Sequence, residues 1–474
     1  MPNLTKIATL EDKAQVAAAL DALGAIGTPE ALDALRTATV PAPLDITRQW
    51  ALLHAAFHVL KTNPSTADSA RDAFASLIKP GSVSSLRVAA AKGYLEANPS
   101  GAWETLSPLL KDDDVKVRLD VARLIAQLPA ESSAPLVTAL PGLDPAVQIV
   151  VVNSFALTRT TDAEPVLQAA LASADPDVHV AAIRGYGTAN LASSAAALFP
   201  FLGKAGDEGD AASASLGQLT DPGFSAAMKT QLAQAQGPMK AALLEVVADR
   251  QDDALKDDAY TAARDPDPAV AEAACDAVKA LVKGDDLPRV LELVPLAKTS
   301  AEHKSVGAAL FHAARIYSDK DKAAGLITAA LTGATPDDRE ALIGALASID
   351  SDKAAAGLQS LLQAPSIDDR KQVIRALSTA RAARSDAILL QWASEGKEES
   401  EKILALRGYL DSIQAQKLAP ATLLGDFKLA WPLAHRQEDR DAILAAVKNT
   451  HGNDAKKLLA ELSASNASSP TSVQ

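Results

Sequence analysis

Aromatic residues are scarce in this chain of 474 residues. Phe, Trp and Tyr together make up only 4% of it, although 48% of its residues are hydrophobic. The apolar content therefore comes mostly from Ala, Leu and Val. Side chains this small suit helices that pack closely against one another, whereas sheets favour β-branched and aromatic residues. The composition predicts an all-α protein.

Cysteine is almost absent as well. The single residue, Cys275 in "AEAACDAV", excludes an intrachain disulfide and the two-cysteine motif that attaches a haem. Its neighbours are apolar at helical spacing. We therefore interpret Cys275 as a small buried hydrophobic side chain and not as a nucleophile.

Long basic runs and long apolar runs are missing too. The chain carries 46 Lys and Arg against 59 Asp and Glu, a net charge of −13, so neither nucleic acid nor anionic lipid is expected as a partner. The longest uncharged stretch, 185–203, contains Pro200 and several Gly, Ser and Asn residues, so we expect no membrane insertion. The first residues lack the apolar core of a signal peptide. We expect a cytoplasmic protein, or a periplasmic or secreted one if a leader has been removed.

Motifs of catalysis and cofactor binding are also missing. There is no phosphate loop, dinucleotide fingerprint or nucleophile elbow, and the paired carboxylates lie at turns before helices, where acids cap amide groups. His54 and His58 lie one helical turn apart, which is metal-ligand spacing, but Ala55 stands where a zinc protease has Glu. We keep them as a weak candidate for a metal site and prefer the interpretation that they are two helix histidines without a ligand role. The chain is predicted to be non-catalytic and to need no cofactor.

What the chain does contain is a repeat. Amphipathic segments that follow a turn with Asp, Pro or Ser begin at intervals of 29 to 39 residues. These segments begin near Glu11, Ile46, Ser84, Asp114, Asp144, Asp177, Glu208, Gly237, Asp267, Glu302, Asp337, Asp368, Ser400 and Asp439. In several of them an Asp-Pro pair fits a helix start, because the acid caps the first amides and the proline needs no acceptor.

A second helical pattern lies between these segments, as in "TDAEPVLQAALAS" at 161–173. Each unit is therefore a pair of helices, and about fourteen pairs fill the chain. One pair cannot bury its apolar face alone, whereas stacked pairs share a continuous core. The prediction is an α-solenoid over 1–462, with a joint or weaker repeat at 203–217 and a disordered tail or linker at 463–474.

The repeats resemble HEAT-like repeats, in the Ala-rich style of some bacterial proteins. The residues that carry the resemblance include Asp114, Val115, Val117 and Arg118 in one unit and "DPDVHV" at 175–180 in another. The resemblance implies a right-handed superhelix in which the second helix of each pair lines a concave surface that binds a protein partner. Some enzymes share the architecture, namely bilin lyases and alkylpurine DNA glycosylases.

A recurring triplet is the most specific feature. Alignment of the second helices places Lys92, Arg184 and Arg407 in one column, each followed by Gly and then by Tyr94, Tyr186 or Tyr409. Arg315 and Arg375 are assigned to the same column, with Tyr317 following Arg315. Glycine inside a helix costs about 1 kcal/mol relative to Ala, so its recurrence suggests the close approach of a neighbouring helix.

Two interpretations of this column stay open. In one, the basic residues pair with acids of the next unit and the tyrosines pack between units. In the other, Lys92, Arg184, Tyr186, Arg315, Arg375, Arg407 and Tyr409 form a partner-binding ladder on the concave face. The leading hypothesis for function is a non-catalytic scaffold that binds a protein or peptide. The alternatives are a structural spacer that carries a further module, and an enzyme on a HEAT-like fold.

Overall fold

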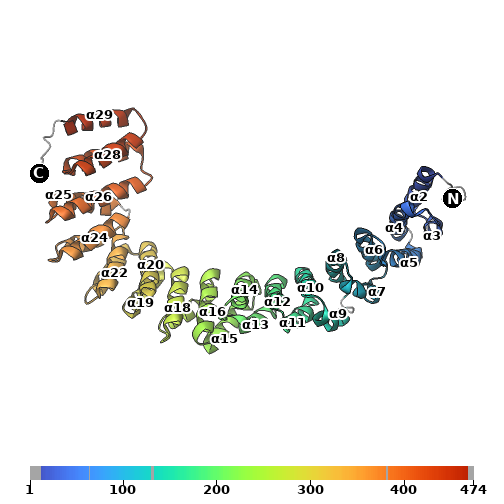
Figure 1. The fold of residues 1–474 in the computed structure, drawn as a ribbon. Helices are drawn as coiled ribbons and strands as arrows, with labels where there is room; N and C mark the ends of the chain where they lie inside the picture. Colours follow the sequence, from blue (N-terminus) through green and yellow to red (C-terminus); the bar gives the residue numbers. More distant parts are fainter. Residues whose placement is uncertain (1–11, 63, 130–132, 381–382, 468–474) are drawn as a thin grey trace. The chain divides into compact units, whose positions relative to one another are not determined.

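The computed structural model describes residues 12–62, 64–129, 133–380 and 383–467. Within these ranges the regular structure consists of twenty-eight α-helices and short 3₁₀ turns, without a strand (Figure 1). The all-α prediction is confirmed, and the chain is an α-solenoid.

The even-numbered helices are the segments that the repeat predicts. Each begins within two residues of its predicted start. They are α2 (Lys13–Ile26), α4 (Asp45–Thr62), α6 (Ser84–Ala97), α8 (Val115–Ile125), α10 (Pro145–Thr158), α12 (Pro176–Ala189), α14 (Asp207–Gln218), α16 (Gly237–Arg250), α18 (Pro268–Leu281), α20 (Ser300–Ile316), α22 (Pro336–Ala347), α24 (Ile367–Ala380), α26 (Glu399–Ala415) and α28 (Gln437–Asn449).

The odd-numbered helices lie between them and are mostly shorter. They are α3 (Pro29–Thr37), α5 (Ala67–Ile78), α7 (Ala102–Leu106), α9 (Ser133–Ala139), α11 (Ala163–Leu171), α13 (Ser194–Leu198), α15 (Phe224–Gln234), α17 (Lys256–Ala262), α19 (Leu287–Leu293), α21 (Lys320–Ala330), α23 (Asp352–Leu362), α25 (Ala383–Glu395), α27 (Pro420–Ala430) and α29 (Asn453–Ala467).

Helix α12 shows why these segments start where they do. The side chain of Asp175 accepts hydrogen bonds from the amides of Asp177 and Val178, at 3.0 and 3.1 Å. Pro176 occupies the first helical position, where no intrahelical acceptor is available for an N–H. Asp144 and Asp267 cap α10 and α18 in the same way, each followed by proline. Local chemistry therefore sets the repeat boundaries.

The chain divides into two compact units, which are unit 1 within Met1–Ala227 and unit 2 within Met228–Gln474. In unit 1, and in unit 2 as far as α26, consecutive even-numbered helices pack on one another, for example α10 on α12 and α24 on α26. They form one layer, and the odd-numbered helices cover its other side (Figure 1). The layer of even-numbered helices is called the even layer below.

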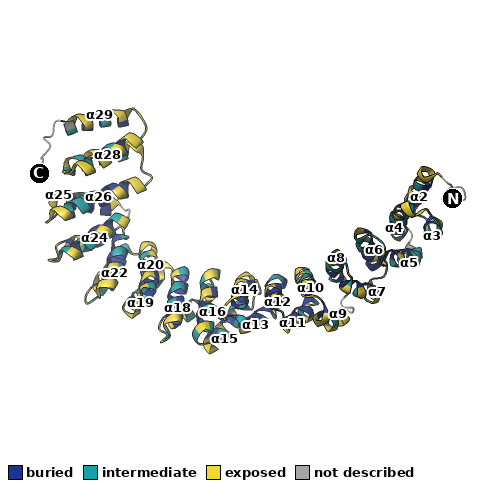
Figure 2. Ribbon diagram, in the orientation of Figure 1, coloured by how far each residue is buried: buried dark blue, intermediate teal, exposed yellow. Residues whose placement is uncertain are grey.

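The core lies between the two layers and between successive repeats (Figure 2). In α12, for example, Val178, Ile183 and Tyr186 are buried, whereas Asp177 and Arg184 are exposed. Small and medium apolar side chains fill most of this core. The arrangement agrees with the low aromatic content, because closely spaced helices leave little room for rings.

Two expected boundaries can be compared with the structure. The stretch 203–217, expected to be a joint or a weaker repeat, is occupied mostly by α14, which packs on α12. The division between the units falls later, within α15. The polar stretch from Ser463 was expected to be a disordered tail, but α29 continues to Ala467. Residues 468–474 lie outside the described range.

Among the described residues, every helix is too short or too polar to span a bilayer.

Candidate partner-binding groove

A row of cationic or polar side chains ties successive repeats together. The fourth residue of α6, Arg87, donates from Nε to the carbonyl of Ile78 at 2.9 Å and from Nη1 to Asp112 at 3.0 Å. The fourth residue of α16, Lys240, pairs with Asp265 at 2.7 Å. Asp112 and Asp265 each stand three residues before the next even-numbered helix begins. Where the fourth residue of an even-numbered helix is Arg or Lys, we call it a structural cation position.

Other repeats satisfy the same position differently. Arg48 pairs with Asp45 at 2.7 Å, and Arg118 donates to the carbonyl of Asp112 at 2.7 Å. Further fourth-position side chains form His179–Glu208, His303–Asp338 and Arg370–Glu401 pairs, and Arg440 donates to the carbonyl of Ala434. Burial of a guanidinium without partners is costly, so these contacts hold the links between repeats in place.

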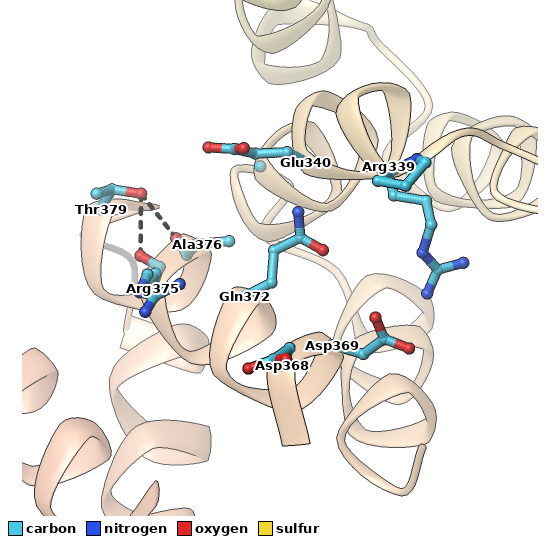
Figure 3. Close-up of a pocket in the computed structure, with 10 residues that line it drawn as sticks. Arg339, Glu340, Asp368, Asp369, Gln372, Arg375, Ala376 and Thr379 are labelled. Atoms are coloured by element: carbon cyan, nitrogen blue, oxygen red, sulfur yellow. Dashed lines mark hydrogen bonds between the residues drawn. The ribbon is translucent and has the colours of Figure 1, made fainter. Parts of the chain in front are cut away.

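Arg339, the fourth residue of α22, makes no ion pair or hydrogen bond through its side chain within the described part of the chain. It lines a groove of about 470 Å³ between α22 and α24. Figure 3 shows Arg339 reaching toward the carboxylate of Asp369, with Gln372 near the centre of the groove and Arg375 toward its other end. The groove is open on the even layer of unit 2.

A second groove of about 400 Å³ adjoins the first, between α20 and α22. Its lining includes His303, Lys304, Asp337 and Glu340, and Glu340 lines the first groove too. The two grooves therefore adjoin at Glu340, and together they extend across three neighbouring helices. We call this pair of grooves the α20–α24 groove.

Small residues open the groove. Gly307 on α20, Ala341 and Gly344 on α22 and Ala376 on α24 all line it. A methyl group added at Gly344 would meet no atom within 4 Å, so this glycine is not required by packing. Because Gly344 has no side chain, it leaves space in the groove.

The charges in the groove are mixed. Arg339, Arg375 and Lys304 face Asp337, Glu340, Asp368 and Asp369, and none of these seven forms an ion pair with another described residue. The carboxylates reduce the attraction of the groove for a purely anionic ligand. The groove therefore suits a ligand that offers both signs of charge.

The structure separates the predicted column into exposed and buried members. Lys92, Arg184 and Arg407 are exposed at the ninth position of α6, α12 and α26. Arg407 pairs with Asp439 at 2.8 Å, and Lys92 lies 3.9 Å from Glu96. Arg184 makes no such pair within the described residues. The equivalent residue of α8, Arg123, was missed because no glycine and tyrosine follow it.

The tyrosines of the column are interior residues. Tyr186 and Tyr409 are only 2% and 3% exposed, so they pack between helices and are not available to a partner. Burial, and then the nearby Glu164, raise the pKa of Tyr186 to about 12. The hydroxyl of Tyr409 donates to Asp426 at 3.1 Å, and the hydroxyl of Thr105 donates to that of Tyr94 at 2.9 Å. Tyr186 and Tyr409 therefore do not belong to the predicted partner-binding ladder.

The glycines of the column have the predicted cause. A methyl group at Gly93 would lie 2.4 Å from the ring of Phe74 on α5. At Gly185 it would lie 2.6 Å from Leu167 on α11. Both neighbours belong to the paired odd-numbered helix. Close approach within a helix pair therefore explains Gly93 and Gly185, whereas a methyl group at Gly408 would lie 3.0 Å from Ser378 on α24.

The last two members of the column behave differently. Arg375 occupies the ninth position of α24 and lines the α20–α24 groove. Arg315 lies in the last turn of α20, two turns beyond that position, with its guanidinium 5.7 Å from the ring of Phe311. Tyr317 follows the end of the helix. The assignment of Arg315 to the column is therefore corrected.

Two further features of the sequence are the histidine pair of α4 and the single cysteine. His54 and His58 are both exposed on α4, and the described residues contain no group of three or more potential ligands around a metal site. Cys275 is buried, as predicted, and burial raises the pKa of its thiol to about 12. A thiol of this kind is a poor nucleophile at neutral pH.

Comparisons with known proteins find a likeness in fold alone. No family model and no curated protein matches the chain. A crystal structure of Kap121p is 12% identical, covers 97% of this chain and 56% of its own length, and gives a TM-score of 0.46. A structure of importin beta is 11% identical, covers 99% of this chain and 78% of its own length, and gives 0.37. A model of the AP-3 complex is 11% identical over 98% of this chain and 93% of its own, and gives 0.38.

Proposed function

We propose that this protein is a non-catalytic scaffold that binds an extended protein segment in the α20–α24 groove. One observation carries the proposal, namely that two grooves on the even layer of unit 2 adjoin at Glu340 and run across three consecutive helices. We assign the repeats to the Ala-rich type on composition.

The dimensions of the groove suit a peptide. Packed helices lie about 8–10 Å apart, so a path across three of them is on the order of 20 Å long. An extended chain advances roughly 3.3 Å per residue, which means that about six residues fill the path. A compact metabolite would occupy only one of the two grooves.

The lining also suits a peptide. Gln372 presents an amide near the centre of the groove, and an amide can donate to a peptide carbonyl while it accepts from a peptide N–H (Figure 3). The charged side chains around it can pair with side chains of the segment. Three carboxylates, on Glu340, Asp368 and Asp369, disfavour a nucleic-acid backbone in the same place.

The proposal is tested by site-specific photo-cross-linking of the full chain. A photoreactive amino acid replaces Gln372 in the groove, or Gln359 on α23, which lines a separate pocket between the odd-numbered helices α23 and α25. Each variant is illuminated in an extract of the cells that produce the protein. We expect a defined protein adduct from position 372 and none from position 359.

A groove-filling variant provides the control. Gly344→Leu in the chain cross-linked through position 372 should abolish the adduct, because the new side chain occupies the space left by the glycine. Equal adducts from both positions, or an adduct that survives Gly344→Leu, would contradict the proposal. The folded state of each variant is checked by far-ultraviolet circular dichroism.

A further inference from the structure

Arg339 stands at a structural cation position whose partner is missing. Arg87 and Lys240 hold Asp112 and Asp265, which precede the next even-numbered helix by three residues. The corresponding residue for Arg339, three positions before α24, is Ala364. The acid that neutralises this position in two other repeats is therefore absent.

Hydrogen bonding confirms that Ala364 and Asp112 are equivalent. Arg118, the fourth residue of α8, donates to the carbonyl of Asp112 at 2.7 Å. Arg370, the fourth residue of α24, donates to the carbonyl of Ala364 at the same distance. The backbone of the two links is thus used in the same way, and the difference between them lies in the side chain.

Neighbouring residues do not replace the lost acid. Glu401, the acid of α26, is held by Arg370 at 2.6 Å. Arg339 reaches toward the carboxylate of Asp369 in Figure 3, but the two side chains form no ion pair. Of the six arginines at the fourth position, the other five, namely Arg48, Arg87, Arg118, Arg370 and Arg440, bond to described residues. The guanidinium of Arg339 is therefore open to a ligand.

We infer that Arg339 is a specificity-determining residue that binds the carboxylate of an acidic side chain in the bound segment. The inference rests on the proposed function and names the chemistry of the partner. A guanidinium offers two parallel N–H donors to a carboxylate, and such charge-assisted pairs are about twice as strong as neutral ones.

The other charges of the groove define what accompanies that carboxylate. Glu340, Asp368 and Asp369 would repel a segment with acidic side chains alone, and Arg339 and Arg375 would repel a basic one. A segment with acidic and basic side chains close together satisfies both sets. The occupant is therefore a mixed-charge, extended peptide with an acidic residue on Arg339.

Blocked synthetic peptides of equal length test the inference on the full chain. One alternates Glu and Lys with Ser and Gly spacers, one carries only Glu as its charged residue, and one carries only Lys. Fluorescence anisotropy measures their affinities. We expect the mixed peptide to bind about fivefold or more tightly than either of the others, and Arg339→Gln to weaken it about tenfold.

Ala364→Asp is the sharper variant, because it restores the missing partner without touching Arg339. It should weaken binding of the mixed peptide to a similar degree and raise the midpoint of urea unfolding, whereas Arg339→Gln should leave that midpoint nearly unchanged. Arg36→Gln, which removes an exposed guanidinium from α3 in unit 1, is the matched control and should alter neither measurement.

The outcomes separate this inference from the proposed function. Equal binding of the mixed peptide by wild type, Arg339→Gln and Ala364→Asp overturns the role of Arg339, as does a failure of the mixed peptide to bind. Either result leaves the groove adduct through position 372 as independent support for the scaffold. Loss of that adduct contradicts the scaffold itself, whatever the peptides do.

Discussion

Arg370 and Glu401 form a buried ion pair that joins α24 to α26. Nη2 of Arg370 lies 2.6 Å from Oε1 of Glu401, and the two side chains are 5% and 0% exposed. Arg370 also donates to the carbonyls of Ala364 and Pro365, at 2.7 and 2.8 Å. Removal of either partner would leave an uncompensated charge in the interior, where it is poorly solvated.

We predict that Glu401→Ala lowers the free energy of unfolding by about 3–5 kcal/mol. The double variant Arg370→Met/Glu401→Leu should recover more than half of that loss, because neither charge then remains buried. Urea unfolding followed by circular dichroism measures both. Arg36→Ala on the surface should change stability by less than about 0.5 kcal/mol. A double variant as unstable as Glu401→Ala would show that packing, and not charge, dominates here.

The same substitution at two helix glycines should have opposite effects. Gly93→Ala places a methyl 2.4 Å from the buried Phe74 ring, so we expect a loss of about 1–3 kcal/mol from overpacking. Gly344→Ala meets no atom within 4 Å, so it should gain up to about 1 kcal/mol from helix propensity. Chemical denaturation measures both changes. A loss at Gly344 would mean that this glycine has a structural role after all.

Asp112 should contribute to the acid sensitivity of unit 1. The hydrogen bond from Arg87 holds the pKa of its carboxyl below the ordinary value of 3.8. A lowered folded-state pKa gives stability that is present above the unfolded value and is lost as pH falls through the folded one. We expect the difference in unfolding midpoint between wild type and Asp112→Asn to be large at pH 6 and to shrink steadily below about pH 4. A difference that does not depend on pH would contradict this account.

Cys275 should report the opening of α18. Its thiol is buried, and its pKa is raised to about 12, so little thiolate forms at neutral pH. We expect reaction with a thiol reagent to be slower by a factor on the order of a thousand in the native protein than in urea. Ala445→Cys on the exposed side of α28 provides the comparison and should react at once. Equal native rates at the two positions would show that α18 opens readily.

Arg407 and Arg184 should differ although they share a sequence pattern. Asp439 raises the pKa of Arg407 through a hydrogen bond of 2.8 Å. Its side chain is nearly half exposed, so we expect Arg407→Gln to cost no more than about 1 kcal/mol. Arg184→Gln should cost nothing measurable, because no described residue pairs with that side chain. Differential scanning calorimetry distinguishes the two variants. A lower melting temperature for Arg184→Gln, with none for Arg407→Gln, would show that Arg184 and not Arg407 contributes to stability.

Local chemistry made much of the fold predictable. Asp175 and Pro176 show the reason, because a capping acid and a proline at the first helical position act through neighbours in sequence. The cause of Gly93 was also accessible, since an interior glycine needs a compensating contact. The burial of Tyr186 and Tyr409 could not be predicted, because a helical pattern does not show which side of the helix the next repeat covers.

The sequence by itself determined the all-α class, the repeat and the start of each even-numbered helix, because capping and periodicity are local properties. The tertiary structure decided which column members face solvent. It also decided that Arg339 lacks the partner that Arg87 has in Asp112. That last relationship joins residues 25 positions apart through the stacking of two helices, and only the packed repeats reveal that Ala364 stands in the place of an acid.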